Sequence, residues 1–279
     1  MRVWTKVTAF LPSAPEDWSA WSYVFERNDL LGTLQTDDPP TMSAYLAPGQ
    51  EPSLEKLKAD LIEFGATKVE AEDVPEENWS ESWKQLFKPR RIGGRFLIRP
   101  TWEDYGAEPG DLEIVLDPGQ AFGTGDHPTT RGCLELLEAE QLAGKTVADI
   151  GCGSGILSIA AAMLGAREVI GVDTDPISVE ATIDNAKRNN VDVGARVGKG
   201  FSVLDPGTQY DVVVSNIISA ALIGIAPDAA AFVKPGGSWI VSGIIEANWN
   251  DVQEAAKRAG FKLEREQQEG EWVSAKFSR

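Results

Sequence analysis

Cysteine and histidine are scarce in this 279-residue sequence, and basic side chains are far fewer than acidic ones. The two cysteines, Cys133 and Cys152, and the single histidine, His127, show no metal-ligand spacing. A structural zinc site normally takes about four cysteine and histidine ligands at short intervals. We therefore expect no metal site, and we expect both thiols to be small buried side chains.

Positive charge is also in short supply, because 26 lysines and arginines stand against 43 acidic residues, a net charge of −17. This balance argues against direct contact with nucleic-acid phosphate; it would attract a basic partner, or serve solubility alone. No apolar run approaches the roughly 18 residues of a membrane span, and the first residues lack the apolar stretch of a signal peptide. These absences predict a soluble, cytoplasmic protein without membrane or direct nucleic-acid contact.

The first 74 residues predict a small α+β domain of short alternating elements. The resulting β-α-β-β-α-β order is that of a ferredoxin-like fold, and the segment carries no glycine loop or acid/base cluster. We interpret residues 1–74 as a substrate-recognition domain, joined by a linker helix within 75–88 to a larger domain at 89–279. We expect its strands at 3–11, 30–36, 42–46 and 67–74 and its helices at 16–27 and 53–64.

The larger domain predicts an α/β fold with a Rossmann-like parallel sheet. After two short strands at 96–98 and 112–116 and a helix at 131–137, strands and helices alternate from residue 146 onward. Such alternation places helices on both faces of the sheet and ligands at the carboxyl ends of the strands. We expect strands at 146–150, 168–173, 193–198, 210–214, 238–243, 261–266 and 271–277, and helices from 154 and at 176–189, 218–232 and 248–259.

Three glycines follow the strand at 146–150 and open the next helix, as Asp149-Ile150-Gly151-Cys152-Gly153-Ser154-Gly155. Such a turn lets a ligand touch bare backbone at the positive end of a helix. Asp173 ends the next strand, at the spacing of about 20 residues from which a carboxylate can accept bonds from ribose hydroxyls. The G-x-G-x-G spacing differs from the G-x-G-x-x-G of dinucleotide-binding proteins, although NAD, or a turn without a ligand, remains an alternative.

The glycine turn resembles the D-x-G-x-G-x-G loop of S-adenosylmethionine (SAM)-dependent methyltransferases of the seven-strand class. Residues 116–130 closely resemble the L-D-P-G-x-A-F-G-T-G-T-H-P-T-T signature of ribosomal protein L11 methyltransferases, with Asp126 where the family has threonine. Residues 211–218 resemble the D-V-V-x-A-N-I-L stretch of that family, with Ser215 replacing alanine. The resemblance covers residues 76–279 well and the first 74 only by the order of their elements.

The resemblance implies a set of site residues around SAM. Asn216 would contact SAM and face the reacting nitrogen. His127, near the site, could act as a base that takes a proton from the incoming ammonium. The alternatives are that His127 only pins its loop by hydrogen bonding, that Asp173 caps the following helix, that Thr130 faces solvent and that Phe122 fills the core. The cofactor contacts that the resemblance implies are Thr130, Gly151, Asp173 and Asn216. We also expect cofactor contacts from Gly153 of the glycine turn and from Phe122, which would flank the sulfonium or cap the pocket.

The function implied by the resemblance is transfer of methyl groups from SAM to lysine side chains and the N-terminal α-amine of ribosomal protein L11, leaving S-adenosylhomocysteine (SAH). The small first domain would hold the substrate, and the acidic charge suits a basic ribosomal protein. We expect a monomer. Two alternatives stay open: a methyltransferase of the same family that acts on another protein, and a non-catalytic SAM-binding, ribosome-associated module.

Overall fold

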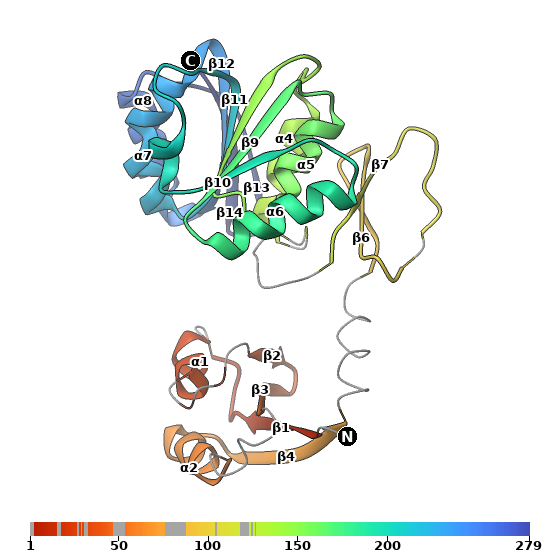
Figure 1. The fold of residues 1–279 in the computed structure, drawn as a ribbon. Helices are drawn as coiled ribbons and strands as arrows, with labels where there is room; N and C mark the ends of the chain where they lie inside the picture. The colour runs from red at the N-terminus through yellow and green to blue at the C-terminus, as the bar shows by residue number, and fades with distance from the viewer. Residues whose placement is uncertain are drawn as a thin grey trace. The chain divides into compact units, whose positions relative to one another are not determined.

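The computed structural model describes residues 3–15, 18–26, 28, 30, 33–46, 54–75, 88–103, 105–117, 123, 125 and 127–279. The chain separates into two compact units, residues 1–86 and 87–279. Figure 1 shows both units. Except for its two end residues, the segment 75–88 in which the linker helix was predicted lies outside the described residues.

The N-terminal unit is an antiparallel sheet with two helices, and its elements follow the predicted order. The strands lie in the order β2-β3-β1-β4, so that β1 pairs with both β3 and β4. Alternate residues of β1, Val7 and Ala9, are fully buried together with Leu57 and Leu61 of α2. The assignment of this unit to the ferredoxin-like fold stays a prediction. The elements are β1 (Val3–Phe10), α1 (Ser19–Glu26), β2 (Leu34–Asp37), β3 (Pro40–Leu46), α2 (Leu54–Phe64) and β4 (Lys68–Pro75).

The C-terminal unit contains a seven-stranded sheet, in the order β10-β9-β8-β11-β12-β14-β13. The strands from β10 to β12 are parallel, whereas β14 runs antiparallel to both β12 and β13. From β8 the chain continues to β9 and β10 on one side of β8, and it then returns to β11 on the other side of β8. Open α/β sheets bind ligands at such a switch in strand order. The strands are β8 (Thr146–Ile150), β9 (Glu168–Asp173), β10 (Gly194–Val197), β11 (Tyr210–Asn216), β12 (Val233–Ile245), β13 (Lys262–Glu269) and β14 (Trp272–Ser278).

Helices cover both faces of this sheet. In Figure 1, α4, α5 and α6 lie on one face and α7 and α8 on the other. All five residues of β8 are buried, as a central strand covered on both sides requires. The predicted parallel α/β fold is confirmed. The helices are α4 (Pro128–Glu138), α5 (Ile156–Met163), α6 (Pro176–Arg188), α7 (Ser219–Phe232) and α8 (Trp249–Arg258), with 3₁₀ turns η3 (Gly200–Val203) and η4 (Glu246–Asn248).

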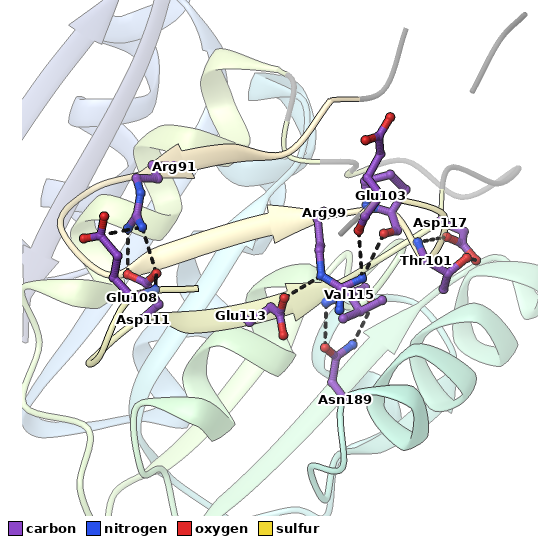
Figure 2. A network of polar contacts seen from close by, with 11 residues as sticks. Arg91, Arg99, Thr101, Glu103, Glu108, Asp111, Glu113, Val115, Asp117 and Asn189 are labelled. Carbon is purple, nitrogen blue, oxygen red and sulfur yellow. Dashed lines mark hydrogen bonds and ion pairs between the residues drawn. The ribbon is translucent and has the colours of Figure 1, made fainter. Parts of the chain in front are cut away.

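A separate three-stranded sheet precedes α4: β5 (Arg90–Ile92), β6 (Phe96–Arg99) and β7 (Leu112–Val115). Its apolar residues join the core beneath α4 and α5. Figure 2 shows the polar side of this sheet, where Arg91 makes two hydrogen bonds to Asp111, at 2.6 and 2.8 Å, and Arg99 bonds to Glu113 at 2.5 Å. Strand β5 is too short for its alternation to be read from the sequence.

Several boundaries differ from the predicted ones. Helix α4 begins at Pro128 and not at residue 131, because His127 is its N-cap and proline suits the first helical position. Strand β2 begins at Leu34 and not at residue 30, and β12 runs from Val233 to Ile245 although residues 238–243 were expected.

Within the described part of the chain, no helix is both long and apolar enough to cross a membrane. No group of three or more described His, Cys, Asp or Glu residues could hold a metal ion.

Candidate functional site

The glycine turn connects β8 to α5 through three left-handed residues. The φ angles are +84° at Gly151, +53° at Gly153 and +82° at Gly155, which is the N-cap of α5. A residue with a Cβ atom adopts this conformation only at a cost of roughly 1–2 kcal/mol. At Gly151 a Cβ atom would also collide with the Ile217 side chain. The turn therefore requires glycine for its backbone path and for the close approach of its neighbours.

The first three backbone amides of this turn are bound to other parts of the protein. The N–H groups of Gly151 and Cys152 donate to the Val172 carbonyl at 2.7 and 3.1 Å. The N–H of Gly153 donates to Asp173 Oδ2 at 3.0 Å. A pyrophosphate is normally held by such amides when they point at the ligand. Their internal pairing favours a cofactor that packs against the turn over one held by phosphates.

Asp173 lies half-buried at the carboxyl end of β9. Its Oδ2 atom holds the turn at Gly153, and its Oδ1 atom accepts from the Asp175 N–H at 3.0 Å. Each carboxylate oxygen has two acceptor positions, so capacity remains for ribose hydroxyls. The alternative that Asp173 caps the next helix is wrong, because the N-cap of α6 is Asp175, which accepts from the Ile177 N–H at 2.9 Å.

A pocket of about 1440 Å³ opens beside the glycine turn. It lies at the carboxyl ends of β8, β9 and β11, next to the point where the strand order reverses. Phe201 and Phe232 stack at 4.9 Å in its wall. The predicted site residues that line it are His127, Gly151, Gly153, Asp173 and Asn216, and other lining residues include Lys199, Phe201, Ile217, Ile218, Phe232 and Trp272.

Asn216 ends β11 on the pocket wall, with Thr130 of α4 behind it. The Asn216 Nδ2 atom donates to Thr130 Oγ1 at 3.4 Å. The amide oxygen of Asn216 therefore points away from Thr130. Thr130 is fully buried, so the alternative that it faces solvent is wrong. It is not among the pocket-lining residues, and its predicted contact with the cofactor stays a prediction. In this structure Thr130 orients Asn216.

His127 caps α4 and forms part of the pocket wall. Its Nδ1 atom lies 2.8 Å from Thr129 Oγ1 and 3.4 Å from the Thr129 amide nitrogen. Its ring meets that of Trp272 edge to face, with centroids 4.6 Å apart. Burial and the nearby Arg131 lower the pKa of His127 below its ordinary value, so its ring is neutral at pH 7. The pinning role is thus observed, and a proton-accepting role stays a prediction.

The two roles of His127 can be separated by substitution. His127→Ala should lower the free energy of unfolding by about 1 kcal/mol through loss of the N-cap, and His127→Asn should restore most of it because asparagine is a preferred cap. Urea unfolding measures this difference. Equal stability of the two variants would contradict the capping role. A methyl-transfer rate that falls equally in both variants would assign the ring a role beyond capping.

Comparison with known proteins assigns the family. The family description "Ribosomal protein L11 methyltransferase (PrmA)" matches residues 16–279 of the chain. The chain belongs to this family.

Relatives of the L11 methyltransferase family align over most of the sequence. The chain is 40% identical over 267 residues to a ribosomal protein L11 methyltransferase of Pelotomaculum thermopropionicum, covering 94% of this chain and 83% of the relative. It is 42% identical over 213 residues to one of Halalkalibacterium halodurans, covering 76% and 68%. The crystal structure of the ribosomal protein L11 methylase of Lactobacillus delbrueckii subsp. bulgaricus superposes with a TM-score of 0.63 at 30% identity, over 68% of this chain and 96% of that one.

As a member of the L11 methyltransferase family, the chain is a SAM-dependent methyltransferase. The residues present suit SAM: Gly151 offers bare backbone, Asp173 a hydrogen-bond acceptor, and the wall between η3 and α7 is largely apolar. Beneath the turn, the fully buried Asp149 has one oxygen, Oδ1, without a hydrogen-bond partner among the described residues. When bound, SAM supplies a methyl group on a positively charged sulfur.

Not every predicted residue can be placed, and some lining residues were missed. Phe122 and Asp126 lie outside the described residues. Phe201 was not predicted as a site residue. The preceding segment, Gly198-Lys199-Gly200, follows a predicted strand at the same edge of the sheet and could have indicated a site there. Trp272 gave no such signal, because it reaches the pocket only through the antiparallel strand β14.

Asp149 predicts a pH dependence of stability. Its burial raises its pKa to about 7, aided by the charge of Asp173 and opposed by the 2.7 Å hydrogen bond from Ser158. Between about pH 4 and pH 7 the carboxyl of Asp149 therefore keeps its proton in the folded protein, whereas it has lost that proton in the unfolded chain. Since the folded state then holds more protons, this group's contribution to stability is greatest at acidic pH and falls as the pH rises toward 7, by a few kcal/mol in all.

The Asp149→Asn variant tests this dependence because its amide has nearly the same shape and does not ionise. Relative to the wild type, the variant should gain stability steadily from about pH 4 to pH 7 and change little above that, because these are the pKa values of the carboxyl in the unfolded and folded states. Urea unfolding at several pH values without cofactor measures the difference. A difference that is the same at every pH would contradict a carboxyl that titrates near neutrality.

Proposed function

We propose that the chain transfers methyl groups from SAM to amino groups of ribosomal protein L11, at lysine side chains and at the N-terminal α-amine. The observation that carries the proposal is one pocket that joins Gly151, Asp173 and Asn216 at the switch in strand order. The names of the relatives, which are L11 methyltransferases, supply the substrate.

The chain's own residues would act mainly by holding the reactants. Gly151 and Gly153 would pack against the cofactor, and Asp173 would accept hydrogen bonds from its ribose. Asn216 would face the attacking nitrogen with its amide oxygen, since its Nδ2 atom is directed at Thr130. Methyl transfer from a sulfonium releases a neutral leaving group, so alignment of nucleophile, methyl and sulfur supplies most of the rate.

The acceptor amine must lose a proton before it attacks, because lysine has an ordinary pKa near 10.4. His127 is neutral at pH 7, since burial lowers its pKa, and it is the candidate acceptor of that proton on the pocket wall. The N-terminal unit would hold the L11 substrate. The net charge of −17 would favour approach of a basic protein.

The proposal is tested by incubating the full chain with SAM and purified L11. Mass spectrometry should show L11 gaining mass in steps of one methylene, with peptide mapping placing the gains on lysines or the N-terminus. If SAH binds but L11 gains no mass, another protein is the substrate or the chain binds the cofactor without turnover. Repeating the incubation with a cell lysate and labelled SAM separates these two outcomes.

A further inference from the structure

The face of α6 that meets the glycine turn carries polar side chains where apolar packing would be expected. Thr182, Asn185 and Asn189 lie at positions i, i+3 and i+7, so they share one side of the helix. Thr182 is fully buried and Asn185 is 8% exposed. Burying a hydroxyl or an amide is unfavourable unless each polar atom finds a partner.

The partners of Thr182 and Asn185 are carbonyl groups of the glycine turn. Thr182 Oγ1 donates to the Gly153 carbonyl at 3.0 Å, and Asn185 Nδ2 donates to the Ser154 carbonyl at 2.9 Å. Ser154 in turn donates from Oγ to the Gly123 carbonyl at 2.5 Å. The contact from Asn185 therefore reaches the turn, and through Ser154 it reaches the segment that leads into His127.

The orientation of the Asn185 amide is itself fixed. Its Oδ1 atom accepts from Arg188 Nη1 at 3.0 Å, which directs the NH₂ group at Ser154. Arg188 also pairs with Asp117 at 3.5 Å. One side of the amide thus faces a cation and the other a carbonyl, and only an amide satisfies both.

Asn189, at the end of α6, fixes the helix to the small sheet. Its side chain accepts from the Val115 N–H at 2.7 Å and donates to the Val115 carbonyl at 2.8 Å, as if it were a residue of a neighbouring strand. Figure 2 shows both bonds, with Asn189 below the end of β7. At the other end of the helix, Asp175 caps the first turn and is bonded to Asp173. Helix α6 is therefore a rigid support from which Asn185 acts.

We infer that Asn185 is a positioning residue for the cofactor, which holds the Ser154 carbonyl and so sets the path of the Gly151–Gly155 turn. The inference rests on the proposed place of SAM at that turn. Asn185 is not a pocket-lining residue, so its effect reaches the cofactor only through the backbone. Its loss should weaken SAM binding and leave the acceptor side unchanged.

The test uses the full chain with Asn185→Asp, a change of one atom in a nearly identical shape. The carboxylate keeps the bond from Arg188 but sets an oxygen against the Ser154 carbonyl. We expect the Kd for SAH by calorimetry and the KM for SAM to rise about tenfold, the effect of one buried hydrogen bond. The KM for L11 and kcat at saturating SAM should stay within about twofold, whereas a merely unstable protein would lose kcat.

Two further variants complete the test. Asn185→Ala removes the donor without adding charge and should raise the Kd for SAH in the same direction, which keeps the test decisive if Asn185→Asp does not fold. Lys187→Ala is the matched control, because Lys187 lies on the same helix, paired with Asp184 at its exposed surface, and should bind SAH as the wild type does. Wild-type affinity for SAH in both Asn185 variants would overturn the inference. Failure of the wild type itself to bind SAH would instead contradict the proposed function.

Discussion

Replacing Gly151 with alanine is expected to weaken the binding of SAH strongly. The residue has φ of +84°, which disfavours any side chain by roughly 1–2 kcal/mol. The new methyl group would also occupy the space of the Ile217 side chain on the pocket wall. Together these effects should raise the Kd by about a hundredfold or more, because each 1.4 kcal/mol is about tenfold. Calorimetric titration of the full chain with SAH measures the loss.

A double variant controls for the collision. Gly151→Ala combined with Ile217→Ala makes room for the methyl group and leaves only the backbone strain. We expect it to recover part of the affinity for SAH and most of the thermal stability. The explanation is wrong if Gly151→Ala alone binds SAH as tightly as the wild type while folding normally.

Replacing Asn216 with alanine is expected to reduce methyl transfer by about a hundredfold to a thousandfold, the usual effect of removing one preorganised polar group that faces a reacting atom. Its amide lies at the carboxyl end of β11, and its bond to Thr130 holds the side chain in one orientation. SAH affinity should change much less than kcat, because the turn and Asp173 are untouched. Single-turnover kinetics with L11 under saturating SAM measures the rate of transfer.

The neighbouring residue provides the matched control. Thr130→Val keeps the shape of the buried side chain and removes only the oxygen that receives the Asn216 hydrogen bond. It should reduce kcat by about tenfold, less than Asn216→Ala, since a free Asn216 still reaches the nitrogen for part of the time. A thousandfold loss of SAH affinity in Asn216→Ala, with kcat unchanged, would assign this residue to cofactor binding alone.

The glycine turn and the parallel sheet were predictable from sequence because local chemistry specifies them. Residues 146–164 contain an apolar strand pattern, three closely spaced glycines and an apolar helix pattern, and few structures other than a strand, a tight turn and a helix fit this order. Asp173 could be placed by its position after the next strand. The start of α4 was harder, because Pro128 and His127 can be read as a loop as easily as a first helical residue and its cap.

Residues that reach the site through tertiary structure could not be predicted. Trp272 follows a turn between antiparallel strands, and only the pairing of β14 with β12 brings it to His127. Asn185 and Asn189 read as solvent-facing positions of an amphipathic helix, whereas the structure aims them at backbone carbonyls. Polar residues have the same spacing on a helix whether they face solvent or bond to buried backbone groups. The periodicity shows which face is apolar, but it does not show what contacts the polar face.

The most direct test of the account is a crystal structure of the full chain with SAH. The account predicts the ribose hydroxyls within hydrogen-bond distance of the Asp173 carboxylate. It also predicts the thioether sulfur beside Asn216 and the glycine turn against the amino-acid part of SAH. SAH bound elsewhere in the pocket with the Asp173 oxygens uncontacted, or no SAH at saturating concentration, would contradict it.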